Sequence, residues 1–146
     1  MAQPTTLKGT ALYIKIGNGA TPEVFTHPCL INSDRGITFR SSTSDIVVPD
    51  CDAPDNPAWR ELVKDALSVG LTGSGVLDNK AATIDAYTDW WKGDVGKNVQ
   101  IWLGTVGYWS GTFKLTEFQI NGTRNNKAQV SLTLESDGEI SDFTAA

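Results

Sequence analysis

The sequence predicts a mainly β fold in which one α-helix packs on a sheet, and three observations lead to this class. Short stretches of alternating apolar and polar residues recur along the chain, and such alternation is typical of strands with one face on a core and the other in water. The composition combines 14 glycines with a single methionine and many Thr, Val and Ile residues, which favours strands. Residues 79–91, by contrast, show a clear helical period.

The length of the chain favours one domain. Its 146 residues are 40% hydrophobic and 20% charged, and a chain of this size can bury a full core without disulfides or metals. No internal repeat of about 20–50 residues is present in the sequence. We therefore expect a single domain over residues 1–146.

The first third of the chain predicts three strands. Alternation over residues 10–16 predicts the first, and Gly17-Asn18-Gly19 predicts a turn after it, because these residues tolerate positive φ. Residues 24–31 form an apolar run that Pro28 interrupts, which indicates an edge strand or a bend since proline lacks the ladder donor. Alternation returns over residues 36–40.

Residues 41–57 are rich in Ser, Pro and Asp, which is typical of a loop. A loop of this length inside a compact domain is uncommon and is usually functional or disordered. Asn56-Pro57 could form the N-cap and first position of a helix, and apolar residues follow at helical spacing as far as Leu67. The sequence makes a short helix over residues 57–67 plausible and leaves its presence open.

A further strand is predicted over residues 68–77, where Gly73 and Gly75 weaken the alternation, and another over residues 99–103.

The predicted helix lies between these two strands. Asp78 or Asn79 is expected to cap it, it continues through Trp91, and Gly93 ends it. Because Trp90 and Trp91 are adjacent, at least one of them must point away from the apolar stripe. A tryptophan in that position is typical of a packing surface.

Residues 108–135 predict a hairpin whose second strand alternates without a fault. The side chains predicted to face the core are Ala128, Val130, Leu132 and Leu134. In the first strand the alternation shifts between Leu115 and Phe118, which predicts a β-bulge near Thr116-Glu117. Residues 136–146 form an acidic C-terminal tail.

The charged and reactive residues do not predict a catalytic or metal site. The net charge of -5 argues against binding to nucleic acid through a basic patch. His27 is the only histidine and lies beside a proline, so a solvated loop position is favoured over a catalytic relay. Asp50, Asp52 and Asp55 partly match a calcium loop, but prolines interrupt the spacing and the expected Gly and Glu are missing. We expect no catalytic residue, no metal and no cofactor.

The two cysteines, Cys29 and Cys51, have no CxxC spacing and are expected to be free thiols, with one disulfide left open. The first residues lack the charged and apolar regions of an export signal. No window approaches the roughly 18 apolar residues of a membrane span. We therefore expect a protein made and assembled in a cytoplasm, with no membrane insertion.

Two classes of protein fit these patterns better than an enzyme does. The first is a structural subunit that assembles with its own copies, in which the five tryptophans serve the core or a subunit interface. The second is a β-sandwich carbohydrate-binding or adhesion module that uses an exposed Trp59 or Trp109.

Six short segments occur in a characteristic order along nearly the whole chain. They are Gly9-Thr10-Ala11-Leu12-Tyr13-Ile14-Lys15, Trp59-Arg60-Glu61-Leu62, Leu71-Thr72-Gly73-Ser74-Gly75-Val76-Leu77, Trp90-Trp91-Lys92-Gly93, Tyr108-Trp109-Ser110-Gly111-Thr112-Phe113 and Leu132-Thr133-Leu134-Glu135-Ser136-Asp137-Gly138. No single segment is specific, but their succession resembles the major tail tube proteins of long non-contractile phage tails, including those of phage-like gene transfer agents.

The resemblance implies a tail-tube-like β-sandwich or half-barrel flanked by one α-helix, with a long extended loop. It further implies that six copies close a ring and that the rings stack. Residues 41–67 would be the long loop that reaches the next ring. The residues of this inter-ring loop singled out here are Asp45, Asp50, Asp52, Asp55, Trp59 and Arg60.

The resemblance also implies a lumen through which DNA passes without specific binding. Polar positions on the predicted strands are assigned to it: Thr38, Arg40, Ser68, Thr72, Ser74, Lys114, Thr116, Gln129, Ser131 and Thr133. Because Lys and Arg drive phosphate binding, a conduit should carry few of them, and Arg40 and Lys114 depart from that expectation.

The implied partners are other copies of the chain and the tape-measure, terminator and distal proteins of a tail. The implied location is the tail of a virion or virion-like particle that is assembled in the cytoplasm of a bacterial host.

Overall fold

The computed structural model divides the chain into two compact units. We call the larger unit, Met1–Thr38 with Val69–Ala146, the body, and the smaller unit, Phe39–Ser68, the arm. The residues that the structure describes are 3–19, 22–28, 30–77 and 79–145. The expectations for Cys29 and Asp78 lie outside them.

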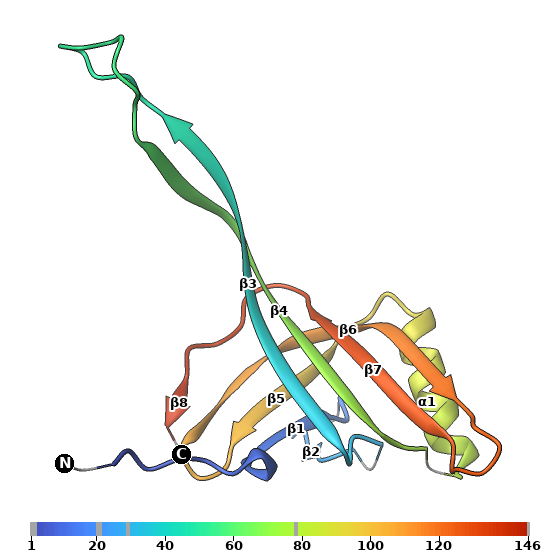
Figure 1. Cartoon of the computed structure of the whole chain (residues 1–146). Helices are drawn as coiled ribbons and strands as arrows, with labels where there is room; N and C mark the ends of the chain where they lie inside the picture. The colour runs from blue at the N-terminus through green and yellow to red at the C-terminus, as the bar shows by residue number, and fades with distance from the viewer. Residues whose placement is uncertain (1–2, 20–21, 29, 78, 146) are drawn as a thin grey trace. The chain divides into compact units, whose positions relative to one another are not determined.

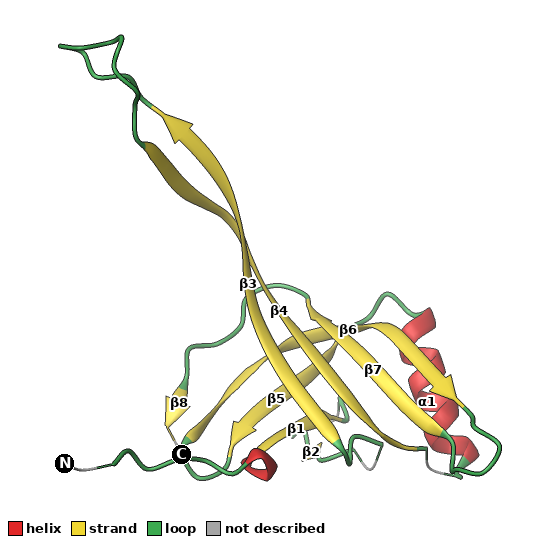
Figure 2. Ribbon diagram, in the orientation of Figure 1, coloured by secondary structure: helices red, strands yellow, loops and turns green. Residues whose placement is uncertain are grey.

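The described residues form one 3-10 turn, eight strands and one α-helix (Figure 1, Figure 2). Their bounds are η1 Gly9–Ala11, β1 Leu12–Gly17, β2 Phe25–Thr26, β3 Asp34–Val47, β4 Arg60–Val76, α1 Ala81–Lys92, β5 Lys97–Leu103, β6 Gly107–Asn121, β7 Gln129–Ser136 and β8 Thr144–Ala145. No helix among the described residues is long and apolar enough to span a membrane.

All the strands belong to one open antiparallel sheet. The strand order is β2-β1-β5-β6-β7-β4-β3, and β8 pairs with the end of β6 that β7 leaves uncovered. The mainly β fold with one flanking helix is therefore confirmed. The resemblance implied a β-sandwich or a half-barrel, and the structure has a single open sheet with α1 packed against β6 (Figure 2).

In the described part of the body, thirteen buried apolar residues form the core. They come from β1, β4, β5, β6, β7, the segment after β2 and the helix: Ile14, Leu30, Ile31, Val69, Leu71, Trp90, Val99, Ile101, Phe113, Leu115, Val130, Leu132 and Leu134. No polar or charged residue in the described part of the chain is buried. The predicted core face of β7 is confirmed for Val130, Leu132 and Leu134, which are all buried. Ala128, the fourth predicted position, is half-buried and precedes the strand.

Gly73 and Gly75 have a packing role that the sequence did not reveal. The segment that contains Ile31 crosses β4 so closely that a Cβ atom at Gly73 would lie 2.7 Å from the Ile31 side chain. A Cβ atom at Gly75 would meet the Leu30 carbonyl oxygen. The side-chain oxygen of Asn32 also accepts a hydrogen bond of 3.1 Å from the Val76 N–H. The glycines therefore allow close approach of the chain rather than merely weakening the strand.

The helix begins later than predicted. Its N-cap is Lys80, which has an extended backbone and makes no side-chain capping bond, so the expected Asn79 cap is wrong. At the other end, the Gly93 N–H donates to the Asp89 carbonyl over 2.9 Å and the helix ends there as predicted.

The two adjacent tryptophans of α1 face opposite environments. Trp90 is 5% exposed and belongs to the core, whereas Trp91 is 53% exposed. The prediction that one of the pair points away from the apolar stripe is confirmed. Tyr87, one turn earlier, stacks on Phe118 of β6 with ring centroids 5.9 Å apart, which fixes the helix against the sheet.

The predicted bulge in β6 is confirmed. Leu115 pairs with Leu134 and Glu117 pairs with Thr133, so Thr116 is the additional residue. Its hydroxyl donates a hydrogen bond of 3.1 Å to the Thr133 carbonyl, which satisfies an acceptor where the ladder is interrupted.

The acidic tail runs along β6 beyond the end of β7. The Asp137 and Ser141 N–H groups each donate over 2.8 Å to carbonyls of β6. Trp109 packs on Phe143 with ring centroids 4.9 Å apart. The tail thus continues the sheet. Trp109, which a carbohydrate-binding module would expose to its ligand, packs against the core instead.

Candidate functional site

The arm is a β-hairpin built from the outer parts of β3 and β4. Residues 41–47 are strand, so the predicted loop is confined to residues 48–59, which we call the tip. The possible helix over residues 57–67 is wrong, because β4 begins at Arg60. An apolar helical stripe is stabilised mainly by packing on a core, and in the arm Leu62 and Leu67 are exposed. Pairing with β3 satisfies the backbone instead.

The predicted inter-ring residues lie at the end of this hairpin. The arm brings together Asp45 and Arg60, which form an exposed ion pair of 3.6 Å. In the tip, the Asp50 carboxylate accepts a hydrogen bond of 3.0 Å from the Asp52 N–H, which is an Asx-turn. Asp55 is also exposed. Trp59 is 91% exposed.

The arm carries many exposed apolar side chains. None of its residues is buried, and three are half-buried at most. Eight of its large apolar side chains are exposed: Phe39, Ile46, Val47, Val48, Trp59, Leu62, Val63 and Leu67. Concentrated exposed apolar surface marks an interaction site, and an isolated two-stranded hairpin is marginally stable in water.

Cys51 lies in the tip as an exposed free thiol, as expected.

The body has a continuous polar face on the side of the sheet opposite the core. Thr72, Thr133 and Glu117 lie in one row across β4, β7 and β6. The next row contains Ser74, Ser131 and Gln119. We define the polar face as these residues together with Asn98, Gln100, Thr112, Lys114, Gln129 and Glu135.

Most of the lumen-facing predictions fall on or beside this face. Gln129 pairs with Asn121 at its end, and Thr116 is the bulge residue beside Thr133. Thr38 is exposed at the last position of β3 within the body. Arg40 and Ser68 belong to the arm.

Sequence reasoning missed the polar positions of β5. Asn98 and Gln100 alternate with Val99 and Ile101, which are buried. The same period-2 signal that identified β7 was present in this short strand and would have found them.

The positive charge of Lys114 is neutralised by two neighbouring carboxylates. Its Nζ atom lies 2.9 Å from an Asp94 oxygen and 3.5 Å from an Asp137 oxygen. The hydrogen bond with Asp94 raises the pKa of Lys114, and the same contact lowers the pKa of the Asp94 carboxyl. Both shifts favour the charged pair. The cation that departed from the expected lumen pattern therefore sits between two negative charges.

Three aromatic residues form a row across β1, β5 and β6. Tyr13 pairs with Trp102, and Trp102 pairs with Tyr108. The Trp102 ring stacks on both, with centroids 6.2 and 4.4 Å away. Lys15 Nζ lies 4.8 Å from the centroid of Trp102, a cation–π contact.

His27 lies beside this row, with its ring 6.2 Å from that of Tyr13. Partial burial, followed by the charge of Arg35, lowers the pKa of His27.

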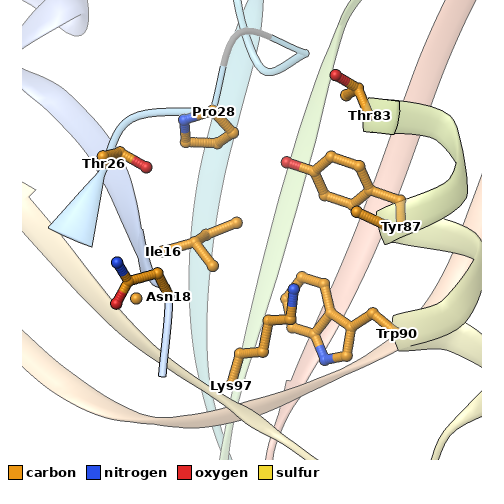
Figure 3. A pocket seen from close by; sticks show the side chains of 10 residues that line it. Ile16, Asn18, Thr26, Pro28, Thr83, Tyr87, Trp90 and Lys97 are labelled. Carbon is orange, nitrogen blue, oxygen red and sulfur yellow. The ribbon is translucent and has the colours of Figure 1, made fainter. Parts of the chain in front are cut away.

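A pocket of about 250 Å³ lies in the body between α1 and the β1–β2 turn (Figure 3). Figure 3 shows helix residues on one side, strand and turn residues on the other, and Lys97 reaching the Trp90 ring. The principal lining residues are Ile16, Thr26, Pro28, Thr83, Tyr87, Trp90 and Lys97. Within the described residues, no group of three or more His, Cys, Asp or Glu side chains could hold a metal ion.

A single sheet with a polar face, carrying an arm of exposed apolar side chains, defines a β-rich structural subunit of an assembly. The family model described as phage tail tube protein matches residues 6–142. The chain therefore belongs to the phage tail tube protein family. It is a structural subunit of a tail tube, and its place is the tail of a virion.

Solved structures share this fold. The tail of an empty gene transfer agent particle, determined with C6 symmetry, contains a chain that is 25% identical, with a TM-score of 0.75 over 96% of this chain and 100% of that chain. A chain in the virion of a native gene transfer agent particle is 24% identical, with a TM-score of 0.73 over the same shares. The SPP1 tail tube is 10% identical, with a TM-score of 0.60 over 97% of this chain and 81% of that chain. A search of curated proteins found no match.

Proposed function

We propose that six copies of this chain close a ring, and that the rings stack into a tube whose lumen conducts DNA during delivery. The observation that carries the proposal is the similarity over nearly the full length of both chains to a tail subunit determined with C6 symmetry. Closure into a ring also removes the open edges of the sheet, which would otherwise invite uncontrolled strand pairing.

In this proposal the polar face lines the lumen. DNA that must move freely requires a wall without uncompensated cations, since phosphate binding is driven by Lys and Arg. The rows across β4, β6 and β7 consist of hydroxyls, amides and carboxylates. Lys114 is held by Asp94 and Asp137. Thr38, Arg40 and Ser68 remain assigned to the lumen with the other predicted positions.

The arm bridges successive rings in the same proposal. It has no buried residue, and its eight exposed large apolar side chains require a partner surface to leave water. Asp45 and Arg60 form an exposed ion pair between the two strands at the base of the tip. Asp50, Asp52, Asp55 and Trp59 then offer charge and aromatic surface to the next ring.

The finished tube would also meet the tape-measure, terminator and distal proteins of the tail, and its assembly would take place in the cytoplasm of a bacterial host.

Electron microscopy of the concentrated protein tests the proposal. We expect stacked rings with sixfold symmetry and a continuous central channel, formed spontaneously or after addition of an initiator complex. Monomers alone under every assembly condition, including with the initiator, would overturn it. A tube with another symmetry would overturn the hexameric ring while leaving the tail tube family unaffected.

A further inference from the structure

We propose that the pocket between α1 and the β1–β2 turn receives the tip of the arm from a second copy of the chain, with Trp59 as the inserted side chain. This inference rests on the proposed function, because it names the surface that the arm engages when copies assemble.

The size of the pocket favours a side chain over a small molecule. Its volume is about 250 Å³, whereas pockets for drug-sized ligands and cofactors measure roughly 300–1,000 Å³. Its walls include the rings of Tyr87 and Trp90 and the apolar surfaces of Ile16 and Pro28. An aromatic side chain can stack on such walls and leave water.

The polar groups of the pocket indicate what should accompany that side chain. Lys97 Nζ lies 5.2 Å from the centroid of the Trp90 ring, so the pocket carries a cation beside its aromatic wall. Trp90 is 5% exposed, and its Nε1–H has no hydrogen-bond partner. A buried donor left unpaired is unusual in a native protein. A partner that supplies carboxylate or carbonyl oxygens would complement both groups.

The tip has the matching chemistry. Residues 48–59 contain three aspartates and no Lys, Arg or His, so the tip carries three negative charges. Trp59 is 91% exposed at its end. Tryptophan is the residue type most enriched among interface hot spots, where it fills a pocket on the partner. The tip therefore offers an aromatic anchor with acids beside it, opposite a pocket with aromatic walls and a cation.

The arm and this pocket lie on different surfaces of the same chain, which also gives the right kind of assembly. An anchor on one surface and its pocket on another make a heterologous contact, which propagates from copy to copy instead of ending at a dimer. Every copy then donates one tip and accepts one, as a growing tube requires.

Cysteine cross-linking in assembled tubes tests the contact. The background carries Cys29→Ser and Cys51→Ser, and Ala58→Cys places a thiol next to Trp59. A second thiol is added at Thr83→Cys on the pocket wall. The matched control is Asp85→Cys, which lies on the same helix at an exposed position outside the pocket. Tubes are confirmed by electron microscopy, treated with a short bismaleimide and analysed by denaturing electrophoresis.

We expect a ladder of covalent multimers from the Thr83→Cys tubes and at least tenfold less from the Asp85→Cys tubes. Tubes that give no ladder, or equal ladders from both variants, overturn the pocket contact and leave the tube function standing. A link within one chain shows that the arm occupies its own pocket and likewise overturns the inference. Absence of tubes in the unmodified protein overturns the proposed function and this contact with it.

The anchor itself is tested by the concentration needed for assembly. Trp59→Ala should raise the critical concentration about 30-fold, as expected for removal of a hot spot. Val106→Ala, which truncates an exposed apolar side chain in the turn between β5 and β6, should change it less than about twofold. Equal effects of the two substitutions would contradict the assignment of Trp59 as the anchor.

Discussion

The body and the arm are both built from β-strands, yet they are stabilised in different ways. The body buries thirteen of its described apolar residues in one core. The arm buries none, although it holds eight of the fifteen exposed large apolar side chains among the described residues. β3 and β4 continue through both units. One strand, β4, therefore contributes buried residues to the core of its own chain at one end and exposed apolar residues at the other.

Removal of the tip should have the largest effect, because it should abolish assembly without changing the stability of the body. Replacing residues 48–59 with Asn-Gly keeps the strands and closes the hairpin with a favoured turn. We expect tube growth to stop while the thermal midpoint of the body stays unchanged, because the tip has no buried residue. Electron microscopy and calorimetry check the two outcomes. Normal tubes from this variant would refute the bridging role of the arm.

Truncation of matched phenylalanines sharpens the contrast in stability. Phe113 is 0% exposed in the body, so Phe113→Ala should lower the free energy of unfolding by about 3–5 kcal/mol. Phe39 is exposed in the arm, so Phe39→Ala should change it by about 0.5 kcal/mol or less. Urea denaturation of the unassembled protein measures both. Similar losses would mean that the arm shares the core.

A single added methyl group tests how tightly the body is packed. Gly73→Ala places a Cβ atom against Ile31 and should cost about 1–3 kcal/mol of unfolding free energy. Gly122→Ala is the control, since no atom lies within 4 Å of the added group. Urea denaturation should show a loss for the first variant only. A neutral Gly73→Ala would show that the crossing segment moves aside freely.

The smallest effect is a dependence of body stability on pH. Because burial and Arg35 lower the pKa of His27 below its ordinary value near 6.5, the unfolded chain binds the proton more readily than the folded one. This contribution to stability is complete above pH 6.5 and is lost as the pH falls through the lower pKa of the folded state.

His27→Gln should remove that part of the slope between about pH 7.5 and 5. Urea midpoints measured at several pH values for both proteins, taken as a difference, report it. An identical slope in the variant would assign the pH dependence to other groups.

Local patterns predicted those features that depend on neighbours in sequence. The alternation in β7 identified its core face, and the parity shift near Thr116 located the bulge. Burial of one tryptophan of the α1 pair also followed from helical geometry. These features need only the periods of strand and helix.

Features that depend on distant residues could not be predicted in this way. Residues 57–67 carry apolar side chains at helical spacing, and only pairing with β3 makes them a strand. The need for Gly73 appears once Ile31 crosses it. The pocket is formed by α1 and a turn some 60 positions earlier in the sequence. Hydrophobic periodicity within either segment does not show that the two are in contact.

The extra residue in β6 can be removed without changing which side chains face the core. Leu115 pairs with Leu134, and the two residues after Thr116, Glu117 and Phe118, pair with Thr133 and Leu132. A strand without Thr116 would keep these pairs and lose only the local bend that the bulge produces, whereas removal of Phe118 would move the residues beyond it to the opposite face. In the course of evolution, Thr116 should therefore be the position in this half of β6 at which loss of a single residue is tolerated.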